Sequence, residues 1–260
     1  MTTEERVEKL ERELARLAER VQTRRLEIVD TEGKTRAALL VTKDGPGLGL
    51  YDEKGQSRAM LRVDKDGPRL HLFDQNGIGR AWLDVFKDAP GLGLFDENGK
   101  IRATLEVTRD GPMLRLYNEH GEARAALSIS KDGPGLAMHD EKGIGRAGLL
   151  VTEHGASLVL SDEKGKSRAA LSVNKDRAGV LVSDENGKVR AMLAALKQGP
   201  VLTLCDEKGK TRAGLLVPKN GPALVLADEN SEPRAVLSIR KHGPGLDLCD
   251  EKGKTIWSAP

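Results

Sequence analysis

The chain has 260 residues, with 42 Lys and Arg against 40 Asp and Glu, so its net charge is close to neutral. This balance argues against nucleic acid or an anionic membrane as a partner, and aromatic residues, at 3%, are too few for base-stacking platforms. No apolar run approaches the ~18 residues of a membrane span, and the N-terminus lacks the apolar segment of a Sec signal peptide. The localisation is left open between the cytoplasm and a virion or cell surface reached without the Sec route.

Residues 1–25 differ from the rest of the chain and predict an α-helix. Their apolar residues are spaced three and four apart, as in the a/d seam of a coiled coil; they are Val7, Leu10, Leu14, Leu17 and Val21. We interpret this segment as a coiled-coil oligomerisation helix, because its seam is narrower than the apolar face of a globular packing helix. The alternative is an amphipathic helix packed on its own chain, and the mix of Val and Leu does not separate dimer from trimer.

Residues 26–260 consist of a 22-residue unit, of which residues 36–57 are one copy. Ten copies follow one another without insertion or deletion, with half a copy at each end. Each copy begins with an arginine; these are Arg36, Arg58, Arg80, Arg102, Arg124, Arg146, Arg168, Arg190, Arg212 and Arg234. A repeat this regular predicts an array that grows by units and not around one core.

Each unit predicts two β-strands joined by turns. Apolar residues alternate with others around Leu39 and again around Leu48, so each strand has one apolar face. Asp44-Gly45-Pro46 and Asp52-Glu53-Lys54-Gly55 are turn signals, and three copies of the second turn carry Asn-Gly, which favours a type I′ hairpin. We therefore predict an all-β repeat protein, an antiparallel meander that forms an elongated shaft.

The two turns also predict the pairing of the strands. A two-residue loop at Lys54-Gly55 pairs Leu50 with Ala59 and Leu48 with Leu61. A turn centred on Asp44-Gly45 pairs Val41 with Leu48 and Leu39 with Leu50. Pro46 has no N–H to close a tight loop there, so we expect a wider four-residue loop. All apolar residues then share one face, which a slip of one residue would destroy.

Three turns lack the glycine that would supply a positive φ. Ala89, Arg177 and Ser231 stand at these positions. A non-glycine residue in that region costs of order 1 kcal/mol. The core positions near Arg177 are also poorer in leucine, so we expect residues 176–197 to be the weakest part of the array.

A single-chain parallel β-solenoid, with one coil per unit, is the alternative fold. It would place Arg36 directly beside Arg58 at ~4.8 Å, and adjacent like charges destabilise a sheet. We therefore favour the meander, in which these residues lie two strands apart. A meander with one apolar face must still close on itself or meet other copies.

Three runs resemble the repeats of trimeric viral and phage fibre shafts: residues 45–55 (GPGLGLYDEKG), 89–99 and 243–253. Such shafts have alternating apolar residues around Gly/Pro turns, often downstream of a coiled coil. The resemblance implies two regions, a coiled-coil oligomerisation helix at 1–25 and a β-repeat shaft at 26–260. It also implies self-association, most simply as a homotrimer.

No residue pattern predicts catalysis, a cofactor or a metal site. The aspartate that recurs as Asp52 and Asp74 is expected to cap its turn, because a lysine in the same turn is wrong for a calcium site. The five histidines fall at unrelated repeat positions and make no ligand spacing. Cys205 and Cys249 are predicted to be free thiols, since four strands would separate them.

The outer face carries a strip of aromatic and arginine residues in the N-terminal half of the array. Its members are Tyr51, Arg58, Phe73, Arg80, Trp82, Phe95, Arg102 and Tyr117. We expect each arginine of the strip to pair with an aromatic ring across the strands. The strip is either a binding surface for a glycan or protein partner or local cross-strand packing.

These features predict a non-enzymatic structural protein, a fibre or spacer formed by a homo-oligomeric β-shaft. The alternative is an adhesin or tail-fibre-like binding module that uses the aromatic and arginine strip. An enzyme is the least favoured class, because no carboxylate pair stands out from the repeat.

Overall fold

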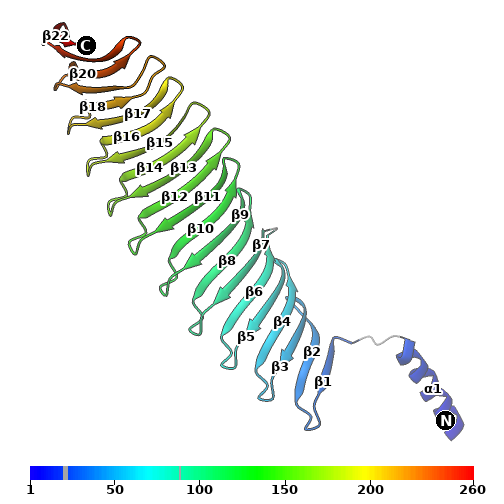
Figure 1. Cartoon of the computed structure of the whole chain (residues 1–260). Coiled ribbons are helices and arrows are strands. Elements are labelled where there is room, and N and C mark those ends of the chain that lie inside the picture. Colours follow the sequence, from blue (N-terminus) through cyan, green and yellow to red (C-terminus); the bar gives the residue numbers. More distant parts are fainter. Residues whose placement is uncertain (20–22, 88) are drawn as a thin grey trace. The chain divides into compact units, whose positions relative to one another are not determined.

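The repeat units fold as pairs of antiparallel strands (Figure 1). The computed structural model describes residues 1–19, 23–87 and 89–260, with the side chains of 17–19 left out. The chain divides into two units, Met1–Ile101 and Arg102–Pro260, each treated by itself. Pairing is antiparallel in both units, so the meander is confirmed and the parallel solenoid is wrong.

Helix α1, Thr3–Glu19, begins at a capping box. The backbone N–H of Glu5 donates to Oγ1 of Thr2 at 3.3 Å, and the N–H of Thr2 donates to the Glu5 carboxylate at 2.6 Å. Leu10 and Leu14 are 64% and 70% exposed, so the described part of the seam is not packed on its own chain. Val21 lies outside the described residues. The helix is confirmed, and its coiled coil stays a prediction.

The first unit contains strands β1 to β7, each paired with the next. They are β1 Arg25–Val29, β2 Thr35–Thr42, β3 Gly45–Tyr51, β4 Ser57–Asp64, β5 Gly67–Phe73, β6 Gly79–Phe86 and β7 Ala89–Phe95. One row of directly opposed residues consists only of leucines: Leu39, Leu48, Leu61, Leu70, Leu83 and Leu92.

The second unit continues the pattern, and its first strand, β8, begins at Ile101. Its strands are β8 Ile101–Thr108, β9 Gly111–Tyr117, β10 Ala123–Ser130, β11 Gly133–His139, β12 Gly145–Thr152, β13 Gly155–Ser161, β14 Ser167–Asn174, β15 Arg177–Ser183, β16 Val189–Leu196, β17 Gly199–Cys205, β18 Thr211–Leu216, β19 Ala223–Ala227, β20 Pro233–Arg240, β21 Gly243–Cys249 and β22 Thr255–Ala259. The same row runs from Leu105 to Leu246, with Val180 as its one valine.

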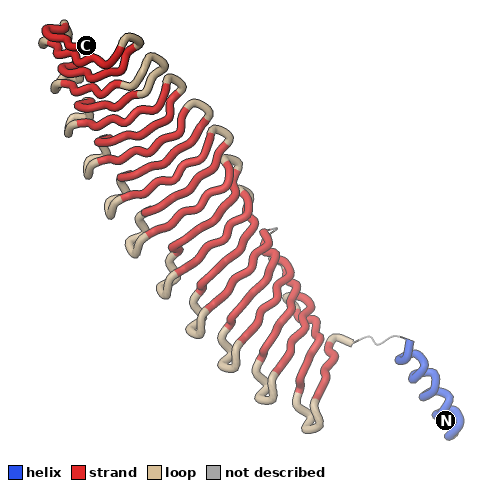
Figure 2. Tube along the Cα trace, in the orientation of Figure 1, coloured by secondary structure: helices blue, strands red, loops and turns tan. Residues whose placement is uncertain are grey.

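The aspartate turns lie at one edge of the strands, and the Gly-Pro turns at the other (Figure 2). In the first aspartate turn after β3, the N–H of Gly55 donates to the Asp52 carbonyl at 3.0 Å, and only Gly55 has a positive φ, 78°. This is a type I turn followed by a glycine bulge, so the predicted type I′ turn is wrong. A separate register shift, between Leu50 and Tyr51, leaves Arg58 opposite no residue and preserves the predicted pairs of Leu50 with Ala59 and Leu48 with Leu61.

The Gly-Pro turn is tighter than the predicted four-residue loop. Thr42 pairs with Gly45, so Lys43 and Asp44 alone form the loop. The observed pairs are Val41 with Pro46, Leu39 with Leu48 and Ala37 with Leu50, a shift of two residues from the prediction. Gly45 is required here, because its φ is 127° and a β-carbon would collide with the carbonyl oxygen of Val63.

The three turns without glycine differ from one another. Ser231 takes the predicted positive φ, 69°. Arg177 does not, because its N–H and that of Asp176 both donate to Oδ1 of Asn174 at 3.0 Å and the turn opens into a bend. In the turn before Ala89, Lys87 has a positive φ, 46°. The positive φ predicted at Arg177 is therefore wrong, and that at Ser231 is confirmed.

The two faces of the strands are unequally covered. Leu39 and Val41 are 52% and 59% exposed, and their counterparts in other strands are similarly open. We call the face with the leucine row the leucine face. The most buried side chains among the described residues, Ala38, Thr104 and Ala194, point to the opposite face.

Candidate functional surfaces

The recurring aspartates cap the turns, as predicted. In the turn after β3, one carboxylate oxygen of Asp52 accepts the N–H groups of Lys54 and Gln56, both at 2.9 Å. The same pair of hydrogen bonds is present at Asp30, Asp74, Asp96, Asp140, Asp162, Asp184, Asp206, Asp228 and Asp250. These oxygens are thus occupied by the backbone, and no metal-binding cluster occurs among the described residues.

The arginine six residues after the aspartate connects neighbouring hairpins. Arg190 lies 3.5 Å from the carboxylate of Asp184 in its own turn. Its Nε also donates to the carbonyl of Cys205, at the end of the next strand, at 3.0 Å. Arg80, Arg146, Arg168 and Arg212 make the same two contacts with their counterparts. Each arginine therefore connects one turn to the following hairpin along the edge.

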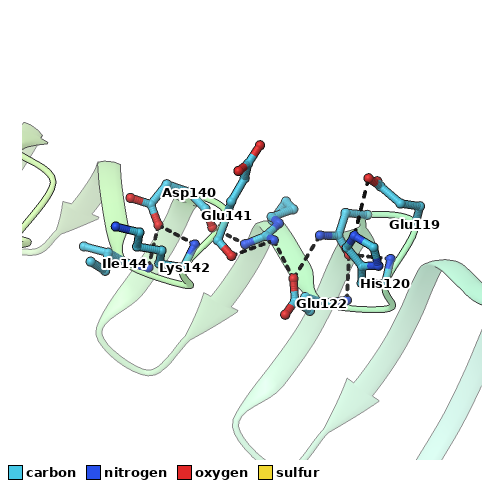
Figure 3. A network of polar contacts seen from close by, with 9 residues as sticks. Glu119, His120, Glu122, Asp140, Glu141, Lys142 and Ile144 are labelled. Atoms are coloured by element: carbon cyan, nitrogen blue, oxygen red, sulfur yellow. Dashed lines mark hydrogen bonds and ion pairs between the residues drawn. The ribbon is translucent and has the colours of Figure 1, made fainter.

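One turn makes the same connection with different residues (Figure 3). Asn118 replaces the aspartate, and its Oδ1 accepts the N–H groups of His120 and Glu122 at 3.0 Å. Arg124 pairs with the carboxylate of Glu122 and donates to the carbonyl of Glu141 at 3.1 Å. The connection between hairpins is kept, although this cap carries no charge.

The capping contacts lower the pKa of most of these aspartates, as Asp52 and Asp184 illustrate. For Asp52, the N–H of Gln56 is the largest influence, burial opposes it, and the N–H of Lys54 and the charge of Arg58 add to the lowering of the pKa. For Asp184, burial is the largest single influence and raises the pKa, but hydrogen bonds from Lys188 and Asn186 and the charge of Arg190 outweigh it. These carboxylates are therefore held ionised.

The side chains of the aromatic and arginine strip pack locally. Tyr51 covers Gly49, since a β-carbon there would lie 2.6 Å from the tyrosine hydroxyl oxygen. The indole of Trp82 covers Gly93 in the same manner. The hydroxyl of Tyr117 lies 3.2 Å from Thr104 Oγ1. These contacts favour cross-strand packing over one continuous binding surface.

The predicted pairing of arginine with aromatic rings is not found at three positions. The strands oppose Tyr51 to Ser57, Phe73 to Gly79 and Tyr117 to Ala123. A register shift beside each ring leaves the arginine opposite no residue, and Arg58, Arg80 and Arg124 lie near the carboxylates of the turns instead. Sequence reasoning missed this role, although the constant six-residue spacing from Asp to Arg was its signal.

Other candidate groups are few. Cys205 and Cys249 are free thiols and are half-buried. His71 lies beside Phe73, with ring centroids 6.1 Å apart, and burial, with the charges of Arg69 and Arg62, lowers its pKa. In the described part of the chain, no helix is long and apolar enough to cross a membrane.

Comparisons with known proteins do not assign a family. No family model matches the chain, and no curated protein matches it. Among solved structures, a TarM mutant from S. aureus has a TM-score of 0.26 and 13% identity over 45% of this chain. The Tc holotoxin pore of Photorhabdus luminescens has a TM-score of 0.20 and 11% identity over 90%. This chain covers 22% and 18% of those chains, respectively, and at such scores the likeness carries no argument.

Proposed function

We propose that this chain is a non-enzymatic structural protein that assembles with copies of itself into a trimeric β-shaft. The leucine faces of three chains form the shared core, and the α1 helices form a coiled coil that sets the register. The uncovered leucine face is the observation that carries the proposal.

The size of the leucine face supports burial against other copies. In the second unit, its leucine row crosses strands β8 to β21, which at about 4.8 Å per strand is on the order of 60 Å. Flanking rows of apolar residues, such as Val107 and Leu116, widen it. An exposed apolar patch on a monomer rarely exceeds a few hundred Å², whereas an interface of standard size takes about 800 Å² from each partner.

A second copy is the natural partner of this face because both surfaces repeat with the same period. The leucine rows of two copies would contact each other at every strand, whereas a partner without the repeat could not match this spacing. The charged groups at the aspartate edge are already paired within each chain, so they remain solvated at the rim. This division into an apolar core and a polar rim is the usual anatomy of a stable interface.

Light scattering after size-exclusion chromatography tests the proposal. We expect the wild-type chain to have three times its monomer mass of 28.1 kDa. Replacing Leu149→Lys and Leu171→Lys on the leucine face should lower that mass, because buried lysines would lose their hydration without a partner. The matched control is Ser128→Lys with Ser172→Lys, which lie on the opposite face of strands that do not pair with each other and should leave the mass unchanged. A wild-type monomer at micromolar concentration, or an unchanged mass in the leucine variant, would contradict the proposal.

A further inference from the structure

A cavity of about 440 Å³ lies on the face opposite the leucine face, along strand β3. Gly47 and Gly49 form its floor, and Leu40 of β2 and Met60 of β4 form its sides. Tyr51 closes one end; Lys43, Asp44 and Arg62 line the other. The volume falls in the range of small-molecule sites, which are mainly apolar with a few polar groups.

The backbone does not require glycine at position 47. Its φ is not in the left-handed region, and a β-carbon would lie 3.4 Å from the carbonyl oxygen of Leu61, which is tight but open to adjustment. The equivalent position is also glycine in four other strands, at 91, 135, 179 and 245, and holds a larger side chain in the rest, such as Arg69, Met113 and Val201. A strand glycine that the backbone does not need often marks close approach by another group. The missing side chain of Gly47 is what keeps the cavity open.

The same first unit shows which shape fits over such a floor. Strand β7 also has the sequence Gly-Leu-Gly, at residues 91–93, and the indole ring of Trp82 lies over Gly93. Gly91 and Gly93 are both buried; in β3, Gly49 is likewise buried, under the ring of Tyr51, and only Gly47 is half-buried. The glycine floor of β7 is therefore covered by a planar aromatic ring of the chain itself, and that of β3 is left partly open.

The charged end of the cavity favours an anion. Lys43, Asp44 and Arg62 line this end, and Arg62 and Arg69 share the carboxylate of Asp64, so three cations stand against two anions. One Nη of Arg62 lies 3.4 Å from Asp64, while its enclosed Nε has no hydrogen-bond partner among the described residues. Because the Nε is enclosed, a ligand would contact the outer nitrogens of this guanidinium, whose side chain is 41% exposed, and a carboxylate is the group that guanidinium binds best.

We propose that this cavity binds a planar aromatic carboxylate. The ring lies over Gly47 between Leu40 and Met60, and the carboxylate contacts Arg62 and Lys43. The site is independent of the assembly proposed above, because it lies on the opposite face and remains open when the leucine faces are buried.

Isothermal titration calorimetry of the full chain with indole-3-propionate tests this site. We expect saturable binding to one site per chain. Gly47→Val should weaken binding at least tenfold, because the valine would fill the cavity as Val201 does in β17. The matched control, Gly135→Val, makes the same change at the equivalent position of β11 and should bind like the wild type. Wild-type affinity in Gly47→Val would place the probe elsewhere, for example on the leucine face, and would overturn the proposal.

A second comparison of affinities tests the contact between the ligand carboxylate and Arg62. Wild-type protein should bind indole-3-propionate more tightly than its neutral amide, and Arg62→Gln should abolish that difference. Equal affinity of the wild type for acid and amide would overturn the proposed role of Arg62. If Gly47→Val fails to fold by circular dichroism, Gly47→Ser, which copies Ser157 of β13, replaces it with the same expected direction. Absence of saturable binding to the wild type would overturn the proposal outright.

Discussion

At the scale of single residues, the aspartate caps are the charged groups on which the fold depends most directly. Each accepts two backbone N–H groups of its turn, and most also pair with an arginine, as Asp140 does with Lys142, Ile144 and Arg146. The N–H groups of a turn that lost its cap would have only water as a partner. Because the caps recur in nearly every hairpin, a change of pH that protonates one of these aspartates should affect the other turns in the same way.

Acid should therefore loosen the turns. The pKa of Asp140 is lowered from its ordinary value of 3.8: burial, the largest influence, raises it, and the hydrogen bonds from Ile144 and Lys142 with the pair to Arg146 outweigh that effect. A lowered pKa gives stability that is complete above pH 3.8 and is lost as pH falls through the lowered value. We expect hydrogen exchange in the turn at residues 140–144 to accelerate, relative to the intrinsic rate, between about pH 4 and pH 2.

The turn at Asn118 is the matched control within the same molecule. Its cap oxygen makes the same two hydrogen bonds but belongs to an amide, which does not titrate in this range. Its amides should keep more of their protection at low pH than those of residues 140–144. Equal loss in both turns would mean that the caps do not control the acid response.

At the scale of strands and turns, the sequence predicted which residues share a face but not every pairing. The alternation of apolar residues has a period of two, so a slip of one residue is excluded, whereas a slip of two keeps every face intact. The alternation therefore places Leu39 and Leu48 on one face correctly, but it does not show that Leu39 pairs with Leu48 and not with Leu50. The pairing is set by a turn of only two loop residues, Lys43 and Asp44, which ends at Gly45 with a φ of 127°, and the sequence of the turn does not reveal this length.

The candidate sites also divide into local features, which the sequence predicted, and features that depend on strand pairing, which it did not. The role of Asp52 as a cap is local, and turn chemistry predicted it. The bond from Arg190 to the carbonyl of Cys205 spans two hairpins, and the cavity at Gly47 needs three strands in register. Such features depend on which residues lie opposite each other in neighbouring strands. Predicting them requires a strand register that is correct at every residue.

Residues 176–197 should exchange their amides faster than residues 102–130. The Asn174 side chain relieves the turn at Arg177, but the apolar rows there remain thinner, since Val180 and Val182 replace leucines and Ala195 replaces a valine. Lost apolar area costs ~25 cal/mol per Å², and repeat arrays open locally because each repeat contacts only its neighbours. Hydrogen exchange followed by mass spectrometry on peptides from both segments measures this. Equal protection would show that the second unit opens as one cooperative body.

At the scale of the whole molecule, two apolar surfaces are exposed, and they differ in kind. The leucine face repeats along the strands, so opposed copies could pair in many registers offset by whole units. The seam of α1, from Val7 to Leu17, is short and does not repeat. We therefore assign the helix the role of selecting one register, and the leucine face that of supplying most of the buried area.

Disabling the helix separates these two roles. Replacing Leu10, Leu14 and Leu17 with aspartate leaves the strands unchanged but places charges on the seam, which a coiled coil cannot bury without a partner. We expect the trimer to give way to a lower mass in light scattering or to loss of soluble protein, as leucine faces pair out of register. The control places aspartate at Glu8, Arg12 and Arg16, which the a/d pattern leaves off the seam, and it should keep the mass of the wild type. If the seam variant also keeps that mass and its solubility, the helix does not direct assembly, and the leucine face must select its own register.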